Sequence, residues 1–246
     1  MIEAVVVSVG YSDFLSVTLP YTLAAFDSVT VVTSQTDRET ARLCDHYNVR
    51  YVKSWVHEGH KHSRTKFDKA RLINHGLAHM GCDDWLVHLD ADIVVPRAFK
   101  HWVSEYHMNP DCIYGVDRYD CKGADKWSKL QQSGFLDHSK RWGYLINPPP
   151  SYCTPCARVG HSDFNGWTPI GYFQLWHSSR STRYPTKPTA SAERTDLLFS
   201  TSWPETQRIL IPDFYVIHLS TGTGKMGENW HGRTTPKFGQ SVPLQY

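Results

Sequence analysis

Two aspartates separated by one residue follow a predicted buried strand, and this arrangement constrains the fold more than any other feature of the chain. Asp90-Ala91-Asp92 ends the apolar run at residues 85–89 and precedes a second apolar run at 93–95. A short continuous apolar run is typical of a strand in a parallel sheet, and ligands of open α/β sheets bind at the carboxyl ends of such strands. We therefore expect the two carboxylates at a ligand site, where they could share one hard cation such as Mg²⁺ or Mn²⁺.

The same aspartates could instead form a turn or cap a helix, as Asp often does after a strand. The elements that precede them favour a ligand site. Strands are predicted at residues 4–9, 28–34 and 49–52, with one helix after Gly10 and another from Asp37 to about residue 48. This alternation predicts a parallel sheet whose strands are joined by right-handed crossovers.

The composition is that of a folded domain. The chain has 246 residues, of which 40% are hydrophobic, enough for one α/β domain with an insertion. Its net charge of +2 predicts no strong general attraction to nucleic acid or to an anionic membrane. No apolar stretch approaches the ~20 residues of a membrane span, and the first residues lack the basic start of a signal peptide, so a cytoplasmic protein is expected.

Further elements are predicted on both sides of the acidic pair. A basic stretch at residues 56–75 ends in an amphipathic helix, on which Lys66, Lys69 or Arg71 could bind a diphosphate. A helix to about residue 106 follows the pair, and a later helix is predicted at 193–203. Strands are predicted at 112–116, 166–176, 209–211 and 214–219, whereas periodicity is weak from 117 to 165.

Cysteine and histidine residues in this irregular region form a candidate structural zinc site. Cys153 and Cys156 have the Cys-x2-Cys spacing of many zinc ligands, and His161 follows them. Cys121 or His138 could supply the fourth ligand. The alternative interpretation is that the cysteines are ordinary buried thiols.

Taken in order, the motifs resemble those of the GT-A fold glycosyltransferases over most of the chain. They are Val5-Val6-Val7, Val31-Val32-Thr33-Ser34 with Asp37, Lys66-Phe67-Asp68-Lys69 with Asn74, Asp90-Ala91-Asp92, Gly171-Tyr172-Phe173-Gln174, the strand-end His218, and Asn229-Trp230-x-Gly232-Arg233. The resemblance implies one α/β domain with a Rossmann-like mixed sheet flanked by helices. Its parts would be a nucleotide-sugar-binding half at 1–116, an insertion at 117–165, and an acceptor half with a C-terminal lid at 166–246.

The resemblance also implies metal-dependent transfer of a sugar from a nucleoside-diphosphate sugar, expected to be UDP-linked, to a hydroxyl. Asp90, Asp92 and His218 would hold Mn²⁺ or Mg²⁺ on the diphosphate, where the cation stabilises the leaving charge. Other residues expected to bind the donor are Val9, Tyr11, Thr33, Asp37, Lys66, Lys69, Asn74 and Ala91. Residues expected at the acceptor or in the lid are Trp167, Tyr172, Gln174, Asn229, Trp230 and Arg233.

An inverting transferase also needs a base that takes the proton of the acceptor hydroxyl. By the resemblance, this base would be an acidic residue at the start of a helix. Asp196 is the first candidate and Glu193 the second. Helix capping is the alternative role for both, and the sequence does not separate retaining from inverting stereochemistry.

The acceptor stays open. Aromatic residues of the insertion and the C-terminal half, with basic residues among them, suit stacked bases and phosphates or, equally, sugars. These aromatic residues are Trp127, Trp142, Tyr144, Trp167 and Trp176. The chain resembles phage enzymes that glycosylate hydroxymethylated pyrimidines, so modified DNA is one candidate acceptor, beside saccharides and proteins.

Two other classes of protein fit parts of the pattern. A haloacid-dehalogenase-type phosphatase also has Asp-x-Asp after a strand, with Asp90 as nucleophile, Asp92 as acid, and Asp117 and Asp120 imitating its distal acid pair. A non-catalytic protein that binds glycan or DNA would keep the fold without turnover. The intact acidic residues favour an enzyme.

Overall fold

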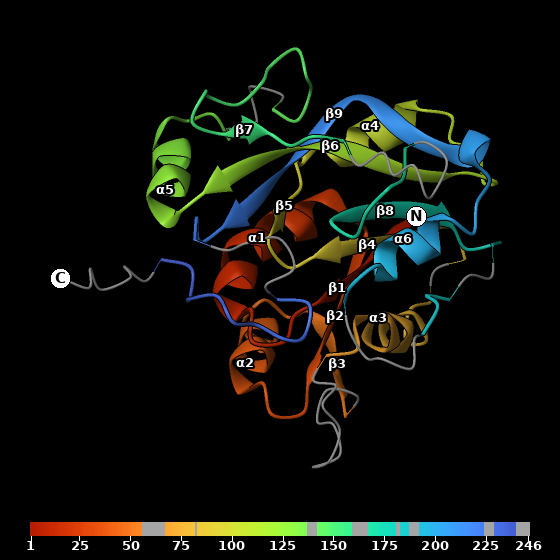
Figure 1. The fold of residues 1–246 in the computed structure, drawn as a ribbon, viewed down its shortest axis with the longest axis horizontal. Coiled ribbons are helices and arrows are strands. Elements are labelled where there is room, and N and C mark those ends of the chain that lie inside the picture. The colour runs from red at the N-terminus through yellow and green to blue at the C-terminus, as the bar shows by residue number, and fades with distance from the viewer. Residues whose placement is uncertain are drawn as a thin grey trace.

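The computed structural model describes residues 1–55, 67–81, 83–136, 142–158, 167–180, 183–186, 192–223 and 229–239. Within these residues, one mixed sheet of parallel and antiparallel strands is covered by helices (Figure 1). The predicted mixed α/β sheet flanked by helices is therefore confirmed. In the described part of the chain, no helix is long and apolar enough to span a membrane.

The first half of the sheet is parallel, as the sequence predicts. Its strands are β1 (Ile2–Val7), β2 (Ser28–Ser34), β3 (Arg50–Ser54) and β4 (Trp85–Asp90), and they lie in the order β3-β2-β1-β4. They are connected through α1 (Ser12–Ala25), α2 (Arg38–His46) and α3 (Lys69–Leu77). Strand β1 ends at Val7, before the predicted end, because the chain turns through Gly10 with a positive φ of 68°.

Alternate residues of β1 pack on opposite faces of the sheet. Ala4 and Val6 belong to a core with residues of α1, α2 and α4 (Ala98–Glu105), whereas Val5 and Val7 pack with α3 and α6 (Thr195–Ser200). Figure 1 shows α1 and α2 on one side of the central strands and α3 and α6 on the other. The sheet is thus buried on both faces, which explains the continuous apolar runs in the sequence.

The second half of the sheet is mixed. Strand β4 pairs antiparallel with β8 (Phe173–His177), which pairs antiparallel with β6 (Ile113–Lys122). Strand β6 pairs parallel with β9 (Arg208–Ser220), and the short strand β5 (Ile93–Val94) pairs antiparallel with β9. A further short strand, β7 (Thr154–Pro155), lies against the end of β6. Strand β9 therefore brings the C-terminal half of the chain back to the acidic pair.

Four boundaries in the second half of the chain differ from the prediction. Strand β6 continues to Lys122 because it stays paired with β9 beyond residue 116, and β8 begins at Phe173. The two predicted C-terminal strands are one strand, since β9 continues through Asp213 with a φ of 57°. A register shift between Gly115 and Asp117 of β6 accompanies this irregularity. The predicted 193–203 helix is the shorter α6, and a 3-10 helix, η3 (Glu205–Gln207), follows it.

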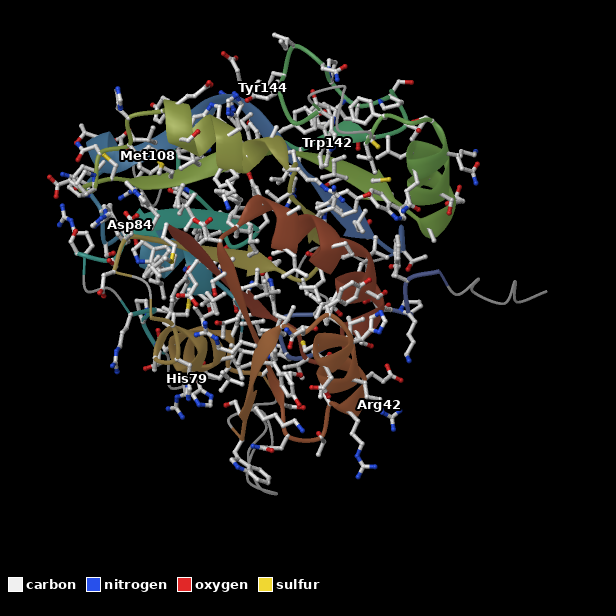
Figure 2. All side chains as sticks on the ribbon, turned by 180° about the vertical axis from the view of Figure 1, so that it is seen from behind. Arg42, His79, Asp84, Met108, Trp142 and Tyr144 are labelled. Carbon is white, nitrogen blue, oxygen red and sulfur yellow. The ribbon has the colours of Figure 1, made fainter. Side chains whose placement is uncertain are left out.

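Several aromatic residues that were predicted to form an acceptor surface are buried. Trp127 of α5 (Ala124–Gln132) and Trp142 belong to a third core beside β6 and β9, and both are 3% exposed. Trp176 of β8 is fully buried. Seen from behind, Arg42 projects from α2 at the rim of the molecule (Figure 2). The prediction of an exposed aromatic surface is therefore wrong for these three tryptophans, because their rings fill the cores.

Candidate active site

The sheet brings Asp92, His218 and Asp120 together. His218 lies opposite Ile93 of β5, the residue after Asp92, and on its other side it lies opposite Asp120 of β6. His218 Nε2 is 3.5 Å from Asp92 Oδ2, and His218 Nδ1 is 3.0 Å from Asp120 Oδ1. The backbone N–H of Leu219 also donates to the carbonyl of Asp92 at 2.8 Å. The predicted neighbourhood of Asp92 and His218 is thus present in the structure.

The side chains of Asp92 and His218 fit a divalent cation. Asp92 Oδ1 is buried and accepts no hydrogen bond from the described residues, which is unusual for a carboxylate oxygen. A carboxylate oxygen and an imidazole nitrogen suit Mn²⁺ or Mg²⁺. Among the described residues no group of three or more His, Cys, Asp or Glu side chains could hold a metal ion. Other coordination positions would therefore be filled by water or by phosphate oxygens of a ligand, as is common for Mg²⁺.

Asp90 is paired with Lys69, which lies between two carboxylates. Lys69 Nζ forms an ion pair with Asp90 Oδ1, and the Lys69 side chain is 15% exposed. Burial opposes the charge of Lys69, but the charges of Asp90 and Asp196 outweigh it and raise the pKa of the lysine. The sequence predicted that Lys69 binds a diphosphate, and the structure places its ammonium group among the acids. Lys66 lies outside the described residues.

Asp196 is fixed at the same site. Its Oδ2 accepts a hydrogen bond from the Gly171 N–H at 2.7 Å, and its Oδ1 accepts from the Leu197 N–H at 2.9 Å. A Cβ atom at Gly171 would lie 3.2 Å from Lys69 Nζ and 3.3 Å from Asp196 Oδ2, so a side chain there would press on both groups. Glu193 is half-buried in the turn before α6. The structure thus brings Asp196 close to Lys69 and Asp90, and its role as a base stays a prediction.

Of the residues predicted to bind the donor, Tyr11 lies close to the acids. Burial raises the pKa of its hydroxyl, and the charges of Asp92 and Asp90 raise it further. Val9 is half-buried and packs against the core next to α3. Tyr11 therefore lies within electrostatic reach of Asp90 and Asp92, while its ring stacks on Phe14.

The other predicted donor ligands hold parts of the protein together. Asp37 caps α2 by accepting from the Thr40 N–H at 3.0 Å, and it also accepts from the Gly10 N–H at 2.7 Å and from Thr33 Oγ1 at 3.1 Å. The side-chain amide of Asn74 bonds both the N–H and the carbonyl of Tyr184. The side chain of Ala91 is buried. A direct contact of Asp37 or Asn74 with a nucleoside stays a prediction, and it would require exchange of one of these bonds.

Gln174 does not face an acceptor. Its side chain is fully buried, its Nε2 donates to the carbonyls of Pro169 and Asp196, and its Oε1 accepts from the Tyr184 hydroxyl. Because a side chain with these partners cannot reach a substrate, the prediction of an acceptor contact for Gln174 is wrong. Trp167 and Tyr172 are half-buried, and the Arg118 guanidinium lies 4.7 Å from the centre of the Tyr172 ring. Their roles at the acceptor stay predictions.

The predicted zinc site does not form among the described residues. Cys121 and Cys153 are buried together in the core beside α5, whereas Cys156 accepts a hydrogen bond from Arg118 Nη2 at 2.7 Å. Cys153 thus lies in the core, whereas Cys156 is only half-buried and is bonded to Arg118. His138 and His161 lie outside the described residues. The buried-thiol interpretation therefore holds for Cys121 and Cys153.

The segment at residues 229–239 packs against the start of α1. Arg233 donates to Asp13 Oδ2 at 2.8 Å and to the Gly10 carbonyl at 2.7 Å, and its guanidinium lies 4.7 Å from the centre of the Tyr11 ring. Asn229 shapes the turn by accepting from the Thr234 N–H at 2.8 Å. Trp230 is 38% exposed, and its carbonyl accepts from the Ala192 N–H at 2.9 Å. This segment thus contacts both Tyr11 and the turn before α6.

Changing Asp13 to alanine is expected to lower the free energy of unfolding by roughly 3–5 kcal/mol, because it leaves the buried Arg233 charge without its carboxylate. The two side chains are only 14% and 10% exposed. Urea unfolding of the two proteins measures the difference. The matched control is Lys237→Ala, which removes an exposed ion pair with Glu39 from the same segment and should change stability little. Equal losses in both variants would contradict the importance of the buried pair.

The metal-free protein is expected to lose stability as pH rises from 6.5 to about 9. Burial lowers the pKa of His218, but the carboxylates of Asp92 and Asp120 outweigh burial and raise the pKa from 6.5 to about 9. Because the folded state binds the proton more tightly, this stabilisation is complete below pH 6.5. It is lost as pH rises through 9 and is on the order of 3 kcal/mol.

Urea unfolding in EDTA from about pH 6 to about pH 9.5 measures this dependence. The variant His218→Gln should not lose stability to unfolding as the pH rises above 6.5. If both proteins show the same slope, a group other than His218 is responsible.

Comparisons with known proteins show remote structural similarity. No protein-family model matches the sequence, and no curated protein matches it either. A nucleotidyl transferase from Methanothermobacter thermautotroptrophicus is 18% identical over 48% of this chain and 65% of its own, with a TM-score of 0.37. A mycobacterial protein is 12% identical over 89% of this chain and 65% of its own, with a TM-score of 0.47.

Glucosyl-3-phosphoglycerate synthase from Mycobacterium tuberculosis, in complex with Mn²⁺, UDP-glucose and phosphoglyceric acid, is also similar. It is 12% identical over 89% of this chain and 71% of its own, with a TM-score of 0.49. The chain therefore spans just under two thirds of the nucleotidyl transferase and of the mycobacterial protein.

Proposed function

We propose that the protein is a metal-dependent glycosyltransferase that uses a nucleoside-diphosphate sugar. The observation that carries the proposal is the meeting of Asp92 and His218, with one Asp92 carboxylate oxygen that accepts no hydrogen bond from the part of the chain that the structure describes. Two protein ligands leave room for phosphate oxygens on the same cation. A diphosphate is a ligand of this kind.

The bound cation would neutralise the negative charge that develops on the leaving diphosphate. Asp92 and His218 are the residues that would hold it. Lys69 lies between Asp90 and Asp196, and its positive charge offsets the repulsion between these acids. Asp90, which is paired with Lys69, would bind a hydroxyl of the donor. Asp196 would accept the proton of the acceptor hydroxyl, the role of a base in an inverting transfer.

The finer assignments also belong to this proposal. We expect a UDP-linked hexose as the donor and Mn²⁺ or Mg²⁺ as the cation. The 5-hydroxymethylpyrimidine of modified DNA, a saccharide and a protein hydroxyl are the candidate acceptors. Burial of Trp127, Trp142 and Trp176 removes three of the side chains that favoured stacked bases, so the DNA acceptor has less support than the sequence indicated.

The phosphatase alternative is disfavoured by the positions of its required acids. Asp117 binds Arg158 through two hydrogen bonds of 2.8 Å, and Asp120 binds His218. The two residues therefore do not form a distal acid pair of their own. Strand β6, which carries both, lies two strands away from β4, with β8 between them.

The test is incubation of the purified protein with a panel of nucleotide sugars and Mn²⁺, with release of nucleoside diphosphate as the readout. Each donor is tried with hydroxymethylpyrimidine DNA, with oligosaccharides and without acceptor, and the mass of the acceptor is recorded. We expect diphosphate release from a UDP-sugar that stops in EDTA. Consumption of no donor with any divalent metal would reject the proposal. Hydrolysis of a generic phosphate ester in the same preparation would favour the phosphatase.

A further inference from the structure

Asp120 contacts the edge of His218 that faces away from Asp92. The parallel pairing of β6 and β9 places Asp120 directly opposite His218, and Asp120 Oδ1 is 3.0 Å from His218 Nδ1. The other ring nitrogen, Nε2, is the one that lies 3.5 Å from Asp92 Oδ2. When Nδ1–H donates to a carboxylate, the neutral imidazole presents the lone pair of Nε2. The contact therefore selects the nitrogen that faces Asp92.

Asp120 is itself held by a neighbouring cation. Arg118 is two residues earlier on the same face of β6, and its Nε is 3.3 Å from Asp120 Oδ1. The guanidinium is fixed from two further sides, because it donates to Cys156 Sγ at 2.7 Å and lies 4.7 Å from the centre of the Tyr172 ring. The side chains of Arg118 and Asp120 are each only 18% exposed. Asp120 thus lies between the Arg118 guanidinium and the His218 ring.

We propose that Asp120 is a positioning residue that fixes the ring of His218 so that Nε2 faces a divalent cation held with Asp92. A carboxylate bonded to the second nitrogen of a metal-ligating histidine orients the ring and raises its basicity. Loss of such a partner typically weakens metal binding by roughly 10–100-fold. The inference rests on the proposed function only in requiring a cation at Asp92 and His218.

The experiment measures binding of Mn²⁺ alone to three variants and to the wild type. Free Mn²⁺ is titrated by electron paramagnetic resonance, and the nitrogen modulation of the bound ion reports whether a histidine is coordinated. Asp120→Ala should bind roughly 10–100-fold more weakly and lose the nitrogen modulation. Asp120→Asn should keep the modulation and lose less affinity, because its Oδ1 can still accept from Nδ1–H. The matched control is Asp117→Asn, which removes a carboxylate of the same strand that is paired with Arg158, and it should bind as the wild type does.

The outcomes separate this inference from the proposed function. If the wild type binds no Mn²⁺, or binds it without nitrogen modulation, both the cation site and the role of Asp120 are rejected. If Asp120→Ala keeps the affinity and the modulation, Asp120 does not position His218, although the cation site stands. Equal weakening of Mn²⁺ binding in Asp120→Asn and Asp117→Asn would show that any negative charge on β6 strengthens binding, and it would contradict a specific role of Asp120. This comparison of the two asparagine variants tests the role of Asp120 even if Asp120→Ala does not fold. A wild type that binds Mn²⁺ with nitrogen modulation but consumes no nucleotide sugar would reject the proposed function and leave the role of Asp120 intact.

Discussion

Replacing Asp92 with asparagine is expected to lower kcat/KM for sugar transfer by at least ~10²–10³-fold, because the leaving diphosphate loses the charge stabilisation of the cation. The fold should survive the change. Asp92 Oδ1 accepts no hydrogen bond from the described residues, and His218 keeps its bond to Asp120. Release of nucleoside diphosphate over a series of Mn²⁺ concentrations measures the loss, and thermal unfolding checks that the protein is folded.

The control for this variant is Asp45→Asn, which changes an exposed carboxylate of α2 and should leave the rate unchanged. Partial recovery of the Asp92→Asn variant at high Mn²⁺ would agree with weakened metal binding. A folded Asp92→Asn or Asp92→Ala protein that transfers sugar at the wild-type rate would show that the cation is held elsewhere.

The second large effect is expected for Asp196→Asn, which should lower kcat by ~10²–10⁴-fold if the residue is the base of an inverting reaction. The KM for the donor and the affinity for Mn²⁺ should change little, because Asp196 lies beside Lys69 and is not one of the two residues expected to hold the cation. Loss of the acidic limb of the pH–rate profile would distinguish a base from a structural role. The measurement is kcat against pH at saturating donor and acceptor.

The variant Glu193→Gln tests the second candidate for the base. A fall in kcat for Glu193→Gln with normal turnover of Asp196→Asn would move the role to Glu193. Normal turnover in both variants would contradict a base in this segment and would agree with a retaining reaction.

The sequence alone determined the elements around the acidic pair. Strands β1, β2 and β4 and helix α2 were predicted because their apolar residues repeat with the period of a buried strand or an amphipathic helix. The position of Asp90 and Asp92 at the carboxyl end of a strand followed from the same local pattern. These predictions depend only on residues close together in the chain.

The tertiary structure decided which polar groups face one another. Asp120 and His218 are 98 residues apart in the chain, and only the pairing of β6 with β9 brings them together. In the sequence, only the alternating polar residues Arg118 and Asp120 pointed to a contact with His218. A strand on the protein surface would show the same alternation, so the contact could not be predicted from it. The position of Lys69 among the acids likewise depends on how α3 packs on the sheet.

The same reason explains the incorrect predictions. Trp176 and Gln174 occur in a segment whose composition fits either a binding surface or a core. Both side chains belong to the core, because β8 lies between β4 and β6 and is buried. The spacing of Cys153 and Cys156 is that of a zinc ligand pair, but in the fold Cys153 packs with Cys121 in a core and Cys156 accepts a hydrogen bond from Arg118. Residue types and local periodicity thus determined the elements and the acidic strand end, whereas strand register and burial, which depend on residues distant in the chain, decided the partners of each side chain.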